Sequence, residues 1–177
     1  MIGAAAPVSA QTATPAPGIP LDVATRRAAI VTDLRYELAL VIPREQKAAI
    51  TGTMTARFAL ADASQPLVLD FAPGAANVTS VKVGGVAVTA TFPQDHIVVP
   101  ASALTAGHTE IAIAFTAGDA SLNRNPDFLY ALFVPARAHL AIPVSDQPDL
   151  KARWTLELNY PGDWQAVSNG APGTIEE

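Results

Sequence analysis

The stretch from Ala141 to Leu158, AIPVSDQPDLKARWTLEL, decides the fold because it joins a turn to an alternating strand within one short block. Pro148 fixes its own φ and keeps Gln147 out of the α region, which is typical of a turn. From residue 152 onward, apolar and polar side chains alternate with a period of two, which indicates a strand. One face carries Ala152, Trp154, Leu156 and Leu158, and the other carries Arg153, Thr155, Glu157 and Asn159. We therefore expect the first of these faces, including Trp154, to lie in the core.

Strand-like alternation recurs along most of the remaining chain. Val81–Val83, Gly84-Gly85 and Val86–Val88 give the clearest hairpin signal, because two glycines suit a tight turn with positive φ. The segment Leu21–Ile30 is the one plausible helix, and its pattern is weak. Fifteen prolines fit many turns better than a helical bundle. The sequence therefore predicts an all-β domain, built as an antiparallel β-sandwich or as saddle-like sheets.

The quoted stretch resembles a sequence pattern of a known family. In that family the form FPCFDxPxxKAxF is followed by P-x-x-W and then by S-N. Here it stands as AIPVSDQPDLKARW, followed by Pro161 to Trp164 and by Ser168-Asn169. The block is similar to the N-terminal β-domain of the aminopeptidase N family of zinc metallopeptidases (gluzincins). Weaker strand matches extend this resemblance over most of the chain, from about Leu34 to Asn169.

The chain divides into three expected segments. Residues 1–10 resemble the tail of a secretory signal peptide, because Val8-Ser9-Ala10 has the Ala-x-Ala-like pattern that precedes cleavage. Residues 11–21 form a Thr/Ala/Pro-rich stretch expected to be a disordered linker. Residues 22–177 would form the β-domain. The resemblance implies that this domain lacks its last strands and is incomplete at its C-terminus. The signal-peptide-like start of the chain predicts a periplasmic or secreted protein.

Composition excludes some classes of partner. The net charge is −5 and lysines and arginines are not clustered, which argues against nucleic acid. The sequence has no apolar window long enough to predict a membrane span. There are no cysteines, so a disulfide framework and a cysteine-based zinc site are both excluded.

The sequence does not carry the chemistry of the family. The resemblance implies a zinc-binding His-Glu-x-x-His helix and a Gly-x-Met-Glu-Asn strand in the parent enzyme, and neither motif occurs here. His96, His108 and His139 are too scattered for a zinc site, and we expect them to be exposed or half-packed in loops. Asp146 and Asp149 are expected to cap the turn and to pair with a neighbouring lysine. We therefore predict no catalytic residue, metal ligand or cofactor in this chain, with zinc in the parent enzyme only.

The apolar run from Phe128 to Val134 is the candidate contact region. It lacks the alternation of a strand with one wet face, so we expect it to be buried on both faces or to lie under another domain. The resemblance places a Gln-x-Glu segment that binds the substrate's amine at positions 132–134. Leu132 and Val134 replace the Gln and Glu, so this carboxylate is missing. Phe133 and Val134 remain as candidates for the wall of the substrate cleft.

Two functions follow as hypotheses. In the first, the chain is the non-catalytic N-terminal domain of an exported zinc aminopeptidase that removes N-terminal residues from peptides. It would pack against the catalytic domain of the same polypeptide and wall its substrate cleft. In the second, the chain is a free-standing β-sandwich module that binds peptide or carbohydrate, which an exposed aromatic platform would favour. Whether the parent is an active enzyme stays open.

Overall fold

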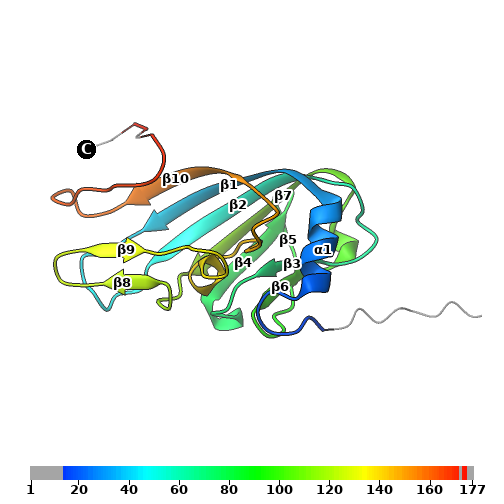
Figure 1. The fold of residues 1–177 in the computed structure, drawn as a ribbon, viewed down its shortest axis with the longest axis horizontal. Coiled ribbons are helices and arrows are strands. Elements are labelled where there is room, and N and C mark those ends of the chain that lie inside the picture. The colour runs from blue at the N-terminus through cyan, green and yellow to red at the C-terminus, as the bar shows by residue number, and fades with distance from the viewer. Residues whose placement is uncertain (1–13, 172, 175–177) are drawn as a thin grey trace, which may run out of the picture.

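The computed structural model describes residues 14–171 and 173–174, and most of its regular structure is strand (Figure 1). The expected signal-peptide remnant, residues 1–10, lies outside the described residues. The strands are β1 (Val31–Val41), β2 (Thr51–Leu60), β3 (Leu67–Asp70), β4 (Val78–Val83), β5 (Val86–Ala87), β6 (His96–Val99), β7 (Gly107–Thr116), β8 (Leu122–Arg124), β9 (Leu129–Ala131) and β10 (Arg153–Asn159). The helices are α1 (Leu21–Ile30) and the 3-10 turns Ala75–Asn77, Ala101–Ala103 and Ala138–Leu140.

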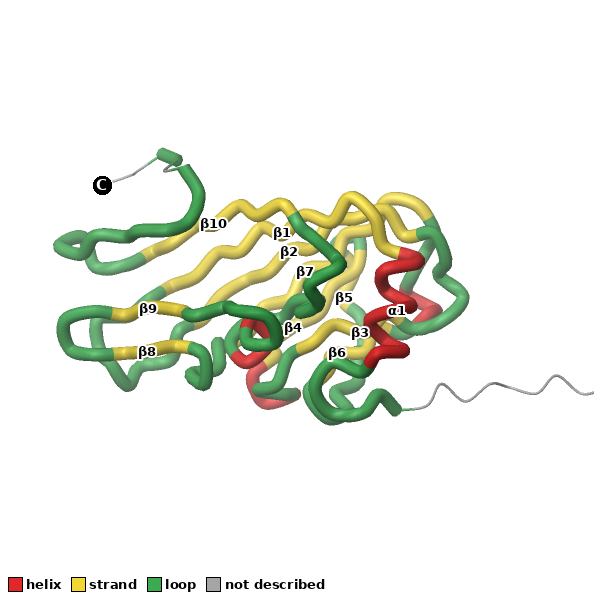
Figure 2. Tube along the Cα trace, viewed as in Figure 1, coloured by secondary structure: helices red, strands yellow, loops and turns green. Residues whose placement is uncertain are grey.

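The strands form open sheets. A six-stranded sheet has the order β10-β1-β2-β7-β4-β5, and β3-β6 and β8-β9 form two-stranded sheets (Figure 2). All pairs are antiparallel except β1 with β10, which run parallel. The prediction of an all-β domain is confirmed. Among the described residues, no helix is long and apolar enough to cross a membrane.

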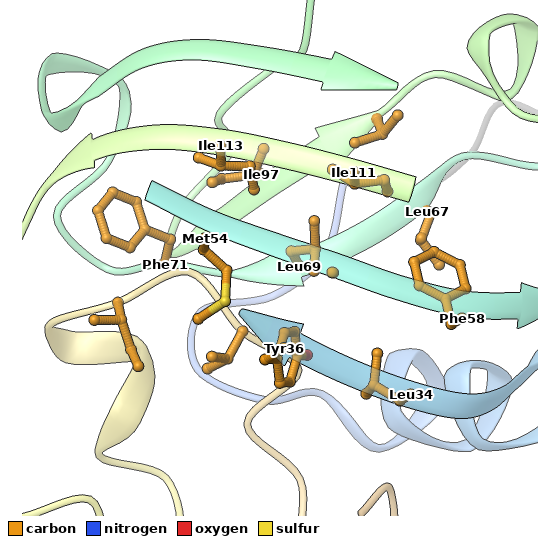
Figure 3. Packing of buried hydrophobic residues seen from close by; sticks show 14 of the residues in the cluster. Leu34, Tyr36, Met54, Phe58, Leu67, Leu69, Phe71, Ile97, Ile111 and Ile113 are labelled. Atoms are coloured by element: carbon orange, nitrogen blue, oxygen red, sulfur yellow. The ribbon is translucent and has the colours of Figure 1, made fainter. Parts of the chain in front are cut away.

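The core lies between the large sheet and a second layer made of β3, β6, α1 and the segment after β9. Alternation along β1, β2 and β7 sends every second side chain to this side, where Figure 3 shows Tyr36, Met54 and Ile113 facing Leu69 and Ile97. Because the two layers interdigitate here, the apolar side chains of both are nearly fully removed from water.

Two local predictions are confirmed. Gly84 and Gly85 have φ values of 54° and 82° and connect β4 to β5, as a tight hairpin turn requires. The helix α1 occupies the predicted segment, although no side chain caps its first turn. The helix begins at Leu21, which is the last residue of the expected linker, residues 11–21. Just before it, the backbone N–H of Gly18 donates to the Asp95 carboxylate at 2.9 Å, which holds the chain against the body.

The expected burial of the β10 face is wrong. Trp154 and Leu156 are 48% and 44% exposed, although they share a face with buried Tyr36 and Leu38 on the neighbouring strand. The alternation itself is correct, and the Trp154 ring lies 4.7 Å from the Tyr36 ring between centroids. However, β10 is the last strand at its edge of the sheet, so one side of each residue lacks a neighbouring strand in the described part of the chain.

Candidate docking surface

The apolar run from Phe128 to Val134 lies on the surface. Its side chains form what we call the apolar surface, whose members with their exposed fractions are Phe128 (52%), Tyr130 (49%), Leu132 (52%), Phe133 (39%) and Val134 (46%). Of the two expected alternatives, burial on both faces is therefore wrong for the chain by itself, and a position under another domain stays a prediction. The run belongs to the β8-β9 hairpin, which has only two strands and cannot enclose a core of its own.

Aromatic side chains dominate one face of the hairpin. Phe128 and Tyr130 are two residues apart on β9 and its approach, so their side chains point the same way. Their rings stack with centroids 6.1 Å apart and planes tilted by 15°. The Tyr130 hydroxyl also accepts a hydrogen bond from the Asn123 amide at 3.0 Å across the hairpin. Monomeric proteins seldom expose a contiguous apolar patch of this kind without a partner.

Arg124 fastens the hairpin to the body. Its guanidinium donates to the carbonyl of Ala48 at 2.8 Å and to that of Glu45 at 3.3 Å, in the loop between β1 and β2. The Gln46 amide donates to the backbone carbonyl of Arg124 at 2.6 Å. These bonds set the position of the hairpin through its polar strand, β8, and leave the aromatic side chains of β9 in solvent.

Phe133 and Val134 lie within the apolar surface, shortly after the end of β9 at Ala131. Two shallow hollows occur on the opposite, outward face of the large sheet. One lies around Thr53 and Ala114, and the other lies around Arg57. Neither hollow includes Phe133 or Val134. Their role as a cleft wall therefore stays a prediction.

The segment that follows, residues 138–149, is called the strap here because it crosses the core side of the sheet and connects the hairpin to β10. Ile142 and Val144 bury their side chains fully. Val144 exchanges both backbone hydrogen bonds with Asp70, at 2.7 and 3.1 Å. The strap also passes so close to Gly118 that a Cβ there would overlap the carbonyl of Leu140. The strap is thus built into the core.

Asp70 is the centre of a buried polar network under the strap. Its carboxylate accepts a hydrogen bond from Arg27 of α1 at 2.8 Å and another from the backbone N–H of Asp146 at 2.8 Å. The Arg27 guanidinium, 2% exposed, also donates to the Gln147 side chain at 2.7 Å. A buried ion pair needs several hydrogen bonds to offset the loss of hydration. In this network the hydrogen bonds of Arg27 and Asp70 join α1, β3 and the strap.

His96 completes this network. It is fully buried, and its Nε2 lies 3.6 Å from the second carboxylate oxygen of Asp70. Neither ring nitrogen of His96 has a hydrogen-bond partner among the described residues, and the same holds for that oxygen. The expectation that the histidines are exposed or half-packed is wrong for His96 and His139. Both lie beside carboxylates in the core, His96 beside Asp70 and His139 beside Asp146.

The strap carries its own charged pair. The Nδ1 of His139 lies 2.7 Å from the Asp146 carboxylate, which also accepts the backbone N–H of His139 at 3.0 Å. The hydrogen bond to Asp146 raises the pKa of His139 despite partial burial. Burial by itself would raise the pKa of Asp146, but the hydrogen bonds from His139 outweigh it and the pKa is lowered. Asp146 thus pairs with His139, and not with the lysine predicted for it.

The sign of the pH dependence follows from these shifts. The His139 contribution is complete below the pKa of an unfolded histidine, about 6.5, and is lost as the pH rises through the raised pKa. The Asp146 contribution is complete above the pKa of an unfolded aspartate, about 3.9, and is lost as the pH falls through the lowered pKa. The pair therefore stabilises the fold most between these values.

The network is suited to holding the fold and not to catalysis. Its polar groups face one another in the core. Tyr36, which accepts the backbone N–H of Ser145 at 2.8 Å, has its pKa raised by burial and so stays protonated. In the described part of the chain, no group of three or more His, Cys, Asp or Glu side chains could hold a metal ion.

Sequence patterns missed most of this network. A charge in the short apolar run Leu67–Phe71 was the one available signal for Asp70, because a buried strand tolerates a carboxylate only with a partner. Arg27 gave no signal, since one arginine in a weakly patterned helix is ordinarily exposed.

Comparisons with known proteins establish the fold. No protein-family model matches the sequence, and no curated protein matches it. Among solved structures, an M1 zinc metallopeptidase from Deinococcus radiodurans aligns with a TM-score of 0.67 and 20% identity, over 84% of this chain and 37% of that one. A two-domain M1 zinc metallopeptidase bound to L-arginine aligns at 0.66 and 21% identity, over 84% and 38% of the two chains.

A more distant structure shares the fold as well. The aminopeptidase A of Legionella pneumophila, in complex with aspartic acid, aligns with a TM-score of 0.55 and 13% identity, over 72% of this chain and 16% of that one. This chain therefore has the fold of one part of M1 zinc metallopeptidases and aminopeptidases. It spans well under half the length of each matched chain.

Proposed function

We propose that this chain is the non-catalytic N-terminal β-domain of an exported, aminopeptidase N-like zinc metallopeptidase. The observation that carries the proposal is the apolar surface, 39–52% exposed in each of its members, on a chain whose fold matches only part of two-domain enzymes. The rest of such an enzyme is the partner that would cover this surface. Phe133 and Val134 would then lie at the junction of the two domains, where they would wall the peptide-binding cleft.

Zinc would be held by the catalytic domain. The histidines of this chain do not fit a zinc site, because His139 is committed to Asp146 and His96 is enclosed beside Asp70. The metal would polarise the substrate's carbonyl and activate a water for hydrolysis of an N-terminal peptide bond. This domain would form one wall of the cleft and hold it in position. Leu132 and Val134 leave that wall apolar, so recognition of the substrate's amine would depend on the catalytic domain.

Export is part of the same proposal. It is supported by Val8-Ser9-Ala10, which precedes the described part of the chain, and by the Thr/Ala/Pro-rich residues that follow. The mature protein would begin near Gln11 and act in the periplasm or outside the cell.

The first test is the reading frame. A His-Glu-x-x-His motif encoded after Glu177 would support the proposal, whereas a stop codon with no such motif in a neighbouring frame would contradict it. The second test uses this chain and a separately produced catalytic domain. Phe133→Ser should weaken their association at least tenfold. The control Val86→Ser changes an equally apolar, 69% exposed residue on β5, an edge strand of the large sheet and not of the β8-β9 sheet, and should leave association unchanged.

The alternative function, a free-standing binding module, is favoured by one observation. Phe128, Tyr130 and Trp154 are about half exposed, and the first two are stacked, which is how aromatic platforms bind sugars or peptides. Titration of the Trp164→Phe variant, in which Trp154 is the remaining tryptophan, with soluble oligosaccharides, followed by tryptophan fluorescence, distinguishes the two functions. Saturable sugar binding together with no association with a catalytic domain would favour the module.

A further inference from the structure

The outer edge of β9 has unused backbone hydrogen-bonding groups. The backbone N–H of Leu132 donates to the carbonyl of Ser121 at 3.1 Å, and that of Asn125 donates to Phe128 at 2.8 Å. Residues that face each other in an antiparallel pair alternate between bonded and non-bonded. The bonded pairs therefore fall on alternate positions of the hairpin.

The register then identifies the free groups. Leu122 faces Ala131 and Arg124 faces Leu129, and both of these pairs fall on the non-bonded positions. The N–H and C=O of Leu129 and Ala131 consequently point away from β8. In the described part of the chain β9 has no second neighbouring strand, and Ala131 is exposed (Figure 1).

The side chains beside this edge are suited to an extended apolar peptide. Phe128, Tyr130 and Leu132 present one continuous apolar face, each about half exposed. The run from Phe128 to Val134 contains no charged residue. Arg124, the charge on the paired strand, is already bound to the loop carbonyls. A peptide strand laid along β9 would satisfy the free backbone groups and place alternate side chains on the aromatic face.

We infer that β9 binds an extended peptide by strand addition, with the backbone of Leu129 and Ala131 bonded to two alternate residues of the peptide. This inference deepens the proposed function, since it names how a peptide would be held at the cleft wall, and it rests on that function. It predicts recognition of backbone and of alternate apolar side chains, without a requirement for a free amino terminus at this site.

The probe is a capped, fluorescein-labelled pentapeptide of alternating threonine and valine, titrated against this chain alone by fluorescence polarisation. Ala131→Pro removes the outward N–H without removing a bond to β8, because proline is tolerated at a strand edge facing solvent. This variant should weaken binding at least tenfold. The matched control Ala131→Val keeps the N–H and should bind like the parent.

A second ligand makes the test independent of how the variant folds. The same pentapeptide, N-methylated at every residue, should lose binding to the unmodified chain at least tenfold, because its backbone can no longer donate. Equal binding of the methylated peptide, undiminished binding to Ala131→Pro, or no saturable binding at about 1 mM peptide would overturn the inference. Since no catalytic domain is present, such a failure leaves the domain-association test of the proposed function intact.

Discussion

Replacing Asp70 by asparagine should strongly destabilise the domain. Asp70 is fully buried, and its carboxylate bonds to Arg27 and to the backbone of Asp146, both at 2.8 Å. The amide keeps the shape and one acceptor but leaves the Arg27 charge uncompensated in the core. Breaking a buried pair in this way costs about 3–5 kcal/mol. Because asparagine retains one acceptor, we expect the lower end, about 3 kcal/mol.

The assay is unfolding in urea and by heat in a Trp164→Phe background, followed by the fluorescence of Trp154, which contacts Tyr36. For a domain of this size, 1 kcal/mol shifts the Tm by about 2–4 °C, so the Tm should fall by roughly 6–12 °C. The control Asp163→Asn breaks an exposed pair with Arg44 and should leave the Tm unchanged.

A double variant tests the reasoning itself. Adding Arg27→Met to Asp70→Asn removes the uncompensated charge, so the two losses should be less than additive by at least about 1 kcal/mol. Additive losses, or a loss below about 1 kcal/mol for Asp70→Asn alone, would refute the assignment of Asp70 as the centre of the network.

Four further outcomes are expected. Phe133→Ser in the isolated chain should change the free energy of unfolding by less than about 0.5 kcal/mol and increase solubility, because the side chain is 39% exposed; a loss near 3 kcal/mol would instead place it in the core. Stability should decline as the pH rises above about 6.5 and through the raised pKa of His139, and His139→Gln should flatten that decline; an equal slope in both proteins would contradict the role of its pair with Asp146. The purified chain should bind no stoichiometric zinc and hydrolyse no chromogenic aminoacyl substrate, and one zinc per chain with turnover would disprove this. Mass spectrometry of periplasmic protein expressed from the full gene should find a start near Gln11, and a retained leader would argue against export.

The alternating strands could be predicted from sequence because period-two patterning reports directly on which side chains face the core. Gly84-Gly85 predicted its turn for an equally local reason. Trp154 marks the limit of such a prediction. Alternation predicts the face of the sheet on which its side chain lies, but the position of β10 in the sheet decides whether a neighbouring element covers that face.

The apolar surface, too, could be predicted only in part from the sequence. The apolar run could be located from composition alone, but its exposure depends on a hairpin that the body holds through Arg124. The buried network could not be predicted, because Arg27 and Gln147 lie 120 residues apart and meet only in the folded chain. That Asp146 pairs with His139, and not with a nearby lysine, likewise depends on the tertiary fold.

The parallel pairing of β1 with β10 has a consequence for how the protein is made. Asp33 on β1 pairs with Arg153 on β10, 120 residues later, so a long stretch of chain must be closed before these strands can meet. Contacts this distant form slowly, and translation delivers β10 after the other strands of the described part of the chain. Until then the free edge of β1 is a template for other chains. We therefore expect ribosome-bound intermediates that end before Arg153 to be the most aggregation-prone species, and chaperones that shield strand edges to act at this stage of synthesis.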